Sequence, residues 1–305
     1  MQQDAILPRR AFAEPATFAP SNEYLSTSMA KKPMKMTGPS VPGSDLRDRV
    51  SGSPLGDPLP LVHVTEMGFG KEILVSGQLK ASRCKVFERD LLYFFLGRPA
   101  YRLRDESEAS QFISRYPCVF VVDPNRVTPS QVYPFDTGAA AAGFYEGADP
   151  HLGIQDYLLE GSYEGARKQL GFAFDGVDDY FEGRVKSGLT DNVPEFEQAT
   201  LSYAAIANQA NRGNNDPTTY DDRASAIEIA THRHLDLKGA VQLLIMPQQF
   251  VEGKNGSKNV TLLKRIKDLG IDVSFYVWDP TRTPADFRAE INAKVLHFVK
   301  GTRAV

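Results

Sequence analysis

Cysteine is scarce in this sequence, and long apolar runs are absent. Cys84 and Cys118 are the only two cysteines among 305 residues. They cannot build a disulfide framework or a cysteine zinc site. A single disulfide between them remains an alternative, but two buried free thiols are the simpler interpretation. No stretch is long and apolar enough to cross a bilayer, and residues 1–20 lack the apolar core of a secretory signal. These absences predict a cytoplasmic protein with no membrane partner.

Excess positive charge is also missing. The 35 Lys and Arg residues are outnumbered by 38 Asp and Glu residues, for a formal net charge of −3. Such a chain has no global positive field toward nucleic acid or membranes, although a local basic patch remains open. Familiar dinucleotide, P-loop, zinc-protease and serine-hydrolase motifs are absent too. His232 and His234 could share one side of a strand, but no third ligand follows at a suitable spacing, so no metal site is predicted.

The chain divides by composition into a leader and one domain. Residues 1–58 are rich in Pro, Ser, Gly and Met without apolar periodicity, which predicts a disordered leader. Met29 within it is an alternative start. Residues 59–305 are predicted to form a single domain with a helical insert at about 124–220. The hydrophobic content of 42% is enough for a sizeable core.

Apolar periodicity within the domain alternates between strand and helix patterns, which predicts a mixed α+β fold. Residues 118–123 are apolar throughout and predict a strand buried on both faces. A charged helix is expected at 106–116 and a loop at 132–145. The remaining expected strands cover 59–66, 91–96, 225–231, 238–247 and 271–279, and the remaining expected helices cover about 69–77, 151–170, 195–211, 261–270 and a segment from 283 onward.

Chemistry-bearing residues lie on three of the expected strands. His63 and Thr65 share one face of the first, although a lone strand histidine is more often a core residue. Tyr93 belongs to an aromatic strand that runs into Arg98, between a glycine and a proline. Arg98 begins a local cationic cluster with Arg102 and Arg104 that suits phosphates, unless these arginines are simply solvated.

Glu228 is the most unusual of these residues. It lies inside a β-branched strand, with Ala226 and Ala230 as its neighbours on the same face. A strand glutamate usually faces water, but small neighbours would also leave room for a ligand over the carboxylate. The single Asp136-Thr137-Gly138 stretch resembles an aspartic-protease motif only superficially, because no second copy exists, and that interpretation is rejected.

The order of these features along the chain resembles that of the NAD-dependent ADP-ribosyltransferases. The features are His63-x-Thr65, an Ile-Leu-x-x-Gly helix, an aromatic strand leading to Arg98, and a late Glu228. Within them the pattern is similar to the DarT-like and diphtheria-toxin/PARP-like branch of the His-Tyr-Glu type. The resemblance covers residues 59 to about 247 and implies a split β-sheet core. The long insert and the C-terminal helix-strand-helix unit depart from it. Ala226 stands where the arginine-directed branch has a second acidic or amide residue.

The resemblance implies a function and a set of roles. NAD would be the substrate, cleaved at the nicotinamide–ribose bond, and ADP-ribose would pass to a nucleic acid or a protein. His63 and Thr65 would hold NAD, and Tyr93 would shape the nicotinamide pocket. Arg98 would engage the cofactor and act with the catalytic acid Glu228, and Arg102 would add a cofactor contact. A toxin or phage-defence effector, with an antitoxin or regulator as partner, fits the same family.

Two other classes of function remain open from the sequence. The chain could be a non-catalytic α/β binding module that recognises a partner through the insert at 124–220. It could also be a metal-dependent nucleotide hydrolase using Asp136 and Glu228. The transferase hypothesis makes the sharpest geometric prediction, because convergence of His63, Tyr93, Arg98 and Glu228 on one cleft would strengthen it.

Overall fold

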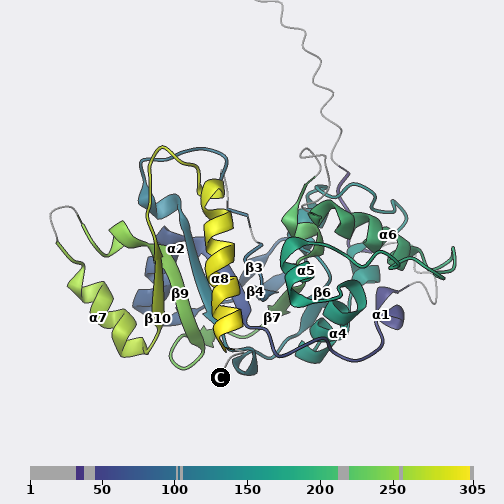
Figure 1. Ribbon diagram of the computed structural model, residues 1–305, viewed down its shortest axis with the longest axis horizontal. Coiled ribbons are helices and arrows are strands. Elements are labelled where there is room, and N and C mark those ends of the chain that lie inside the picture. The colour runs from purple at the N-terminus through teal and green to yellow at the C-terminus, as the bar shows by residue number, and fades with distance from the viewer. Residues whose placement is uncertain are drawn as a thin grey trace, which may run out of the picture. The chain divides into compact units, whose positions relative to one another are not determined.

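The computed structural model describes residues 32–37, 45–100, 102–103, 106–211, 220–253 and 257–302 (Figure 1). Its centre is an eight-stranded sheet in the order β10-β9-β5-β1-β4-β7-β6, with β3 paired to β4 outside this path. Every pairing in the sheet is antiparallel except that of β9 with β10, and β2 and β8 form a separate antiparallel pair. The strands are β1 (Leu61–Glu66), β2 (Gln78–Leu79), β3 (Ser82–Cys84), β4 (Arg89–Leu96), β5 (Pro117–Val122), β6 (Gln131–Tyr133), β7 (Glu228–Thr231), β8 (Leu235–Asp236), β9 (Val241–Pro247) and β10 (Asp272–Tyr276). The predicted α+β fold class is confirmed.

The helices confirm part of the sequence prediction and correct the rest of it. They are α1 (Leu46–Arg49), α2 (Met67–Ser76), α3 (Thr137–Ala141), α4 (Tyr163–Ala173), α5 (Val177–Glu182), α6 (Gln198–Ala207), α7 (Val260–Leu269) and α8 (Arg288–Thr302). Helices α2 and α7 end where glycine was expected to stop them, because Gly77 and Gly270 adopt left-handed backbone conformations. The predicted apolar stripe from Phe287 to Val299 is buried along α8. Among the described residues, no helix is both long and apolar enough to cross a bilayer.

Two local predictions are wrong. The segment 106–116 forms turns and one short 3₁₀ helix instead of a charged helix, and residues 132–145 include the end of β6 and helix α3 instead of a loop. Asp136 is the N-cap residue of helix α3, and its carboxylate accepts a hydrogen bond from the backbone N–H of Ala139 at 2.9 Å. The Asp-Thr-Gly stretch is therefore a helix N-cap, a local function that Asp performs through its short side chain.

Part of the predicted leader is packed on the domain. Leu46 of α1 is fully buried, and the backbone N–H groups of Ile154 and Gln155 donate to the carbonyls of Lys35 and Met36. The composition of the leader could not predict these contacts, because their partners lie more than a hundred residues later in the chain. Residues 1–31 and 38–44 of the leader, including Met29, lie outside the described residues.

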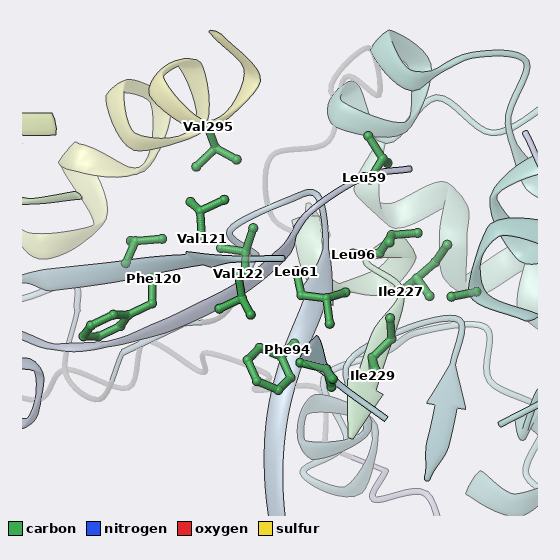
Figure 2. Close-up of a cluster of buried hydrophobic side chains, with 14 of the residues drawn as sticks. Leu59, Leu61, Phe94, Leu96, Phe120, Val121, Val122, Ile227, Ile229 and Val295 are labelled. Atoms are coloured by element: carbon green, nitrogen blue, oxygen red, sulfur yellow. The ribbon is translucent and has the colours of Figure 1, made fainter. Parts of the chain in front are cut away.

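Helices cover both faces of the sheet where β5 and β1 lie side by side. All six residues of β5 are buried, as the continuous apolar run predicted. Figure 2 shows Val295 of α8 beside Val121 on one face, while Phe120 points to the other face. Helix α2 lies on that other face, where Gly70 approaches Cys118. These contacts cover both faces of the sheet along β5.

The close approach of α2 to β5 yields a prediction about stability. A methyl group at Gly70 would lie 2.5 Å from Sγ and 2.8 Å from Cβ of Cys118, a side chain on a rigid buried strand. Gly70→Ala is therefore expected to lower the free energy of unfolding by about 1–3 kcal/mol in urea denaturation. Gly68→Ala is the matched control in the same helix, because its methyl group would meet Ser114 at an ordinary 3.5 Å. Equal stability of the two variants would contradict this close packing.

Candidate functional site

The sheet splits between β1 and β4. These strands pair only at Leu61 with Leu96 and at Val62 with Phe95. Beyond Val62, β1 continues along β5 as far as Glu66, and β4 continues along β7. A gap therefore opens between the two strands at His63, which is the split that the family resemblance implied.

His63 spans this gap. Its Nδ1 atom lies 2.9 Å from the carbonyl oxygen of Tyr93 on β4. A carbonyl can only accept, so Nδ1 carries the proton and donates. Burial lowers the pKa of His63, and the hydrogen bond to the Tyr93 carbonyl offsets this only in part. The ring is therefore neutral at physiological pH, and its Nε2 atom is left as a hydrogen-bond acceptor.

A pocket of about 330 Å³ lies over the split. The register of the strands places Val62, Val64 and Glu66 of β1 on the same face as Tyr93 and Phe95 of β4, and this face is called the pocket face below. Lys80, Ser82 and Leu103 come from neighbouring segments, and Phe69 of α2 lies at the pocket with 58% of its surface exposed. The complete lining is Val62, His63, Val64, Thr65, Glu66, Phe69, Lys80, Ser82, Leu91, Leu92, Tyr93, Phe95 and Leu103. Such an apolar pocket with a few polar groups is typical of sites for small organic ligands.

Tyr93 forms one wall of the pocket and links it to a buried polar cluster. Its hydroxyl donates to Sγ of Cys84 on β3 at 2.8 Å. Burial raises the pKa of Tyr93, and the hydrogen bond to Cys84 and the nearby Glu228 carboxyl raise it further. The phenol therefore stays protonated and acts only as a hydrogen-bond donor or a packing surface. The structure thus brings His63, Thr65 and Tyr93 together at one pocket.

Glu228 lies on the pocket face but outside the pocket. It is directly opposite Phe95 in the β4–β7 ladder, and only 4% of its surface is exposed. One carboxyl oxygen accepts from the Thr137 hydroxyl at 2.6 Å, and the other accepts from the Thr137 backbone N–H at 3.3 Å. Burial raises the pKa of Glu228 well above its ordinary value, and the neighbouring Asp136 carboxylate raises it further. The expected open space over this side chain is occupied by the insert.

The expected convergence of His63 with Glu228 does not occur. Residues directly opposite in antiparallel strands share a face, so Glu228 shares its face with Phe95, and Phe95 shares its face with Val62. His63, one residue after Val62, belongs to the other face. This relation depends on how the strands pair, which the spacing of the two residues along the chain did not reveal.

Arg98 is also outside the pocket, clamped between the sheet and the insert. It is 3% exposed, and its guanidinium donates to the backbone carbonyls of Tyr180 and Asp222 and to the Ser225 hydroxyl. The guanidinium also lies over the Tyr180 ring, 5.0 Å from the centroid. The Tyr180 hydroxyl in turn donates to the carbonyl of Leu96 at the end of β4. Arg98 thus holds the insert on the ends of β4 and β7.

Arg102 is surrounded by acidic side chains. Its guanidinium lies 3.5 Å from Asp221, 3.7 Å from Asp222 and 3.7 Å from Glu106. These carboxylates compete with any phosphate for the same donors, so the positive charge of Arg102 is already balanced by neighbouring side chains. Arg104, the third member of the predicted cationic cluster, lies outside the described residues.

The residues considered for metal chemistry are separated from one another. Among the described residues, no group of three His, Cys, Asp or Glu side chains could hold a metal ion. Asp136 caps α3 and faces Arg223 at 3.9 Å. His232 and His234 hydrogen-bond to the backbones of Asp90 and Ala81. No observation therefore favours the hydrolase alternative.

Two residues of the site were not predicted from the sequence. Glu66 lines the pocket at the end of β1, and Thr137 holds Glu228. The position of Glu66 next to Thr65 was an available signal, because a polar residue ending a strand often lies at a site. Nothing local predicts the contact of Thr137 with Glu228, because 91 residues separate them.

Comparisons with known proteins give only distant similarities. No family model matches the chain, and neither does any curated protein. Among solved structures, DarT of Thermus sp. 2.9 in complex with NAD+ is 11% identical with a TM-score of 0.36, covering 72% of this chain and 96% of that chain. The same protein in complex with ADP-ribosylated ssDNA is 10% identical with a TM-score of 0.38, covering 74% of this chain and 98% of that chain. Function in this chain is therefore inferred from the residues of its own pocket.

Proposed function

We propose that this chain is an ADP-ribosyltransferase that binds NAD in the pocket over the β1–β4 split. The observation that carries the proposal is the neutral His63 ring in the gap, with its Nδ1–H bound to the Tyr93 carbonyl and Nε2 left as an acceptor. An imidazole fixed in this way can accept a hydrogen bond from a ribose hydroxyl. Thr65 adds a hydroxyl at the same pocket, and the rings of Tyr93 and Phe95 offer apolar surfaces to the nicotinamide.

The proposed reaction places clear demands on the pocket. Cleavage of the nicotinamide–ribose bond leaves a ribose cation of the oxocarbenium type, as in glycoside hydrolysis. The apolar walls exclude water and strengthen electrostatic interactions with that cation. A carboxylate beside the ribose would stabilise it. The sequence predicted Glu228 for this role, whereas the carboxylate that lines the pocket is that of Glu66.

The acceptor is proposed at the level of class. ADP-ribose would pass to a nucleic acid or a protein, in the setting of a toxin or defence effector that an antitoxin or regulator controls. Arg98 and Arg102 enter this proposal as residues that position the insert next to the pocket, because backbone carbonyls and carboxylates already engage them. A non-catalytic binding module remains the competing outcome of the experiment below, recognised by NAD binding without turnover.

His63→Ala tests the proposal. Loss of the imidazole removes one hydrogen bond to the sugar and also the strut between β1 and β4. We expect the KM for NAD to rise about tenfold, the equivalent of about 1.4 kcal/mol of lost binding. The measurement is nicotinamide release from NAD, with single-stranded DNA, RNA and cellular protein fractions as acceptors.

His151→Ala is the control, because His151 is an exposed histidine that does not line the pocket. It should behave as the unmodified chain does. If the unmodified chain releases no nicotinamide with any acceptor, the proposed function is wrong, and NAD binding without release would then favour the binding module.

A further inference from the structure

We infer that Glu66 is the carboxylate that faces the bound ribose and receives the proton of the acceptor. This inference rests on the proposed function and assigns its catalytic base to a residue at the pocket. Glu66 ends β1, three residues after His63, on the pocket face that also carries Tyr93 and Phe95. It is one of the residues that line the pocket, whereas Glu228 is not.

The Glu66 carboxylate has no structural task among the described residues. Glu66 is the N-cap residue of α2, yet its side chain makes no capping hydrogen bond. No hydrogen bond or ion pair joins it to another side chain in the described part of the protein. A carboxylate at a pocket that makes no hydrogen bond or ion pair within the described part of the protein has its oxygens available to a ligand.

Glu228 is engaged in the opposite way. Both of its carboxyl oxygens accept hydrogen bonds from Thr137, and the side chain is almost completely buried. To reach a ligand in the pocket it would have to break these bonds and pass the ring of Phe95, its cross-strand neighbour. Its raised pKa also favours the neutral acid, which cannot balance the charge of a ribose cation. Glu228 and Thr137 instead support the wall of the pocket.

Transfer of ADP-ribose needs no base other than Glu66. The bond between the nicotinamide nitrogen and the ribose C1′ breaks, and its electron pair leaves with nicotinamide as a neutral molecule. The carboxylate stabilises the positive charge that remains on the ribose. The acceptor O–H or N–H then forms the new bond to C1′, and its proton passes to the Glu66 carboxylate. No metal, oxidant or reductant is required.

The experiment compares Glu66→Gln, Glu228→Gln and Glu72→Gln in the full chain. Glu72 is an exposed glutamate of α2 that does not line the pocket, so it is the matched control. We expect Glu66→Gln to lower kcat for nicotinamide release about hundredfold while the dissociation constant for NAD changes less than threefold. Glu228→Gln should keep kcat within about tenfold. Glu72→Gln should match the unmodified chain.

Chemical rescue separates a catalytic role from a structural one. Glu66→Ala leaves a space at the pocket. Added formate should raise the kcat of this variant at least tenfold, because a small carboxylate can take the place of the side chain. A purely structural role would give no rescue. If the unmodified chain releases nicotinamide but Glu66→Gln keeps its kcat while Glu228→Gln loses it, this inference is overturned and the proposed function stands. If the unmodified chain releases no nicotinamide from NAD, both are overturned, whether or not it binds NAD.

Discussion

Arg98→Ala is expected to destabilise the protein by about 3–5 kcal/mol, because two buried carbonyls would each lose a donor at a cost of about 1–3 kcal/mol. The guanidinium satisfies the backbone carbonyls of Tyr180 and Asp222, and both carbonyls would lose this donor in a buried place. The contact with the Tyr180 ring would be lost as well. Urea denaturation followed by circular dichroism measures the change in the free energy of unfolding.

Two controls make the Arg98 prediction specific. Arg126→Ala removes an exposed arginine whose ion pair with Asp123 spans 4.0 Å, and it should change stability by less than about 0.5 kcal/mol. Arg98→Lys should restore less than half of the loss, because one ammonium group cannot follow the planar geometry of the guanidinium. Unchanged stability of Arg98→Ala together with a loss of NAD turnover would favour the direct cofactor contact predicted from the sequence.

The free energy of unfolding is expected to fall less with rising pH in Glu228→Gln than in the unmodified protein. Burial raises the pKa of Glu228 in the folded protein above the ordinary glutamate value near 4.3. The protonated carboxyl therefore contributes stability in full below about pH 4, and this contribution is lost as the pH rises toward the raised pKa of the folded protein. Each unit of pKa elevation corresponds to about 1.4 kcal/mol of that loss.

The measurement is the difference in unfolding free energy between Glu228→Gln and the unmodified protein from pH 4 to pH 8. At pH 4 the free energy of unfolding of the variant should be close to that of the unmodified protein. As the pH rises, the variant should become more stable relative to the unmodified protein. Glu195→Gln, at an exposed glutamate, should show a constant difference over the same range. A constant difference for Glu228→Gln would mean that its carboxyl is not held in the neutral form.

Local patterns predicted the elements that bury one continuous apolar surface. The apolar run of β5, the glycine stops of α2 and α7, and the buried stripe of α8 were all predicted from short segments. The predictions failed at 106–116 and 132–145, where the structure depends on distant partners. Tyr116, for example, donates to the carbonyl of Arg282, 166 residues later.

Candidate site residues divide in the same way. His63, Thr65 and Tyr93 come to one pocket because they lie on β1 and β4, which are adjacent strands. Their roles toward NAD stay predictions. Arg98 and Glu228 were expected there too, but the insert buries both. Residue type and spacing along the chain carry no information on which loop covers a side chain.

The sequence by itself determined the fold class and the principal strands, because hydrophobic periodicity and residue type act within a few residues of chain. Only the tertiary structure decided which carboxylate lies at the pocket. Strand pairing puts Glu66, Tyr93 and Glu228 on one face, and the contact of Thr137 with Glu228 then withdraws the latter from the pocket. Such a choice depends on contacts between segments about 90 residues apart, which no local pattern encodes.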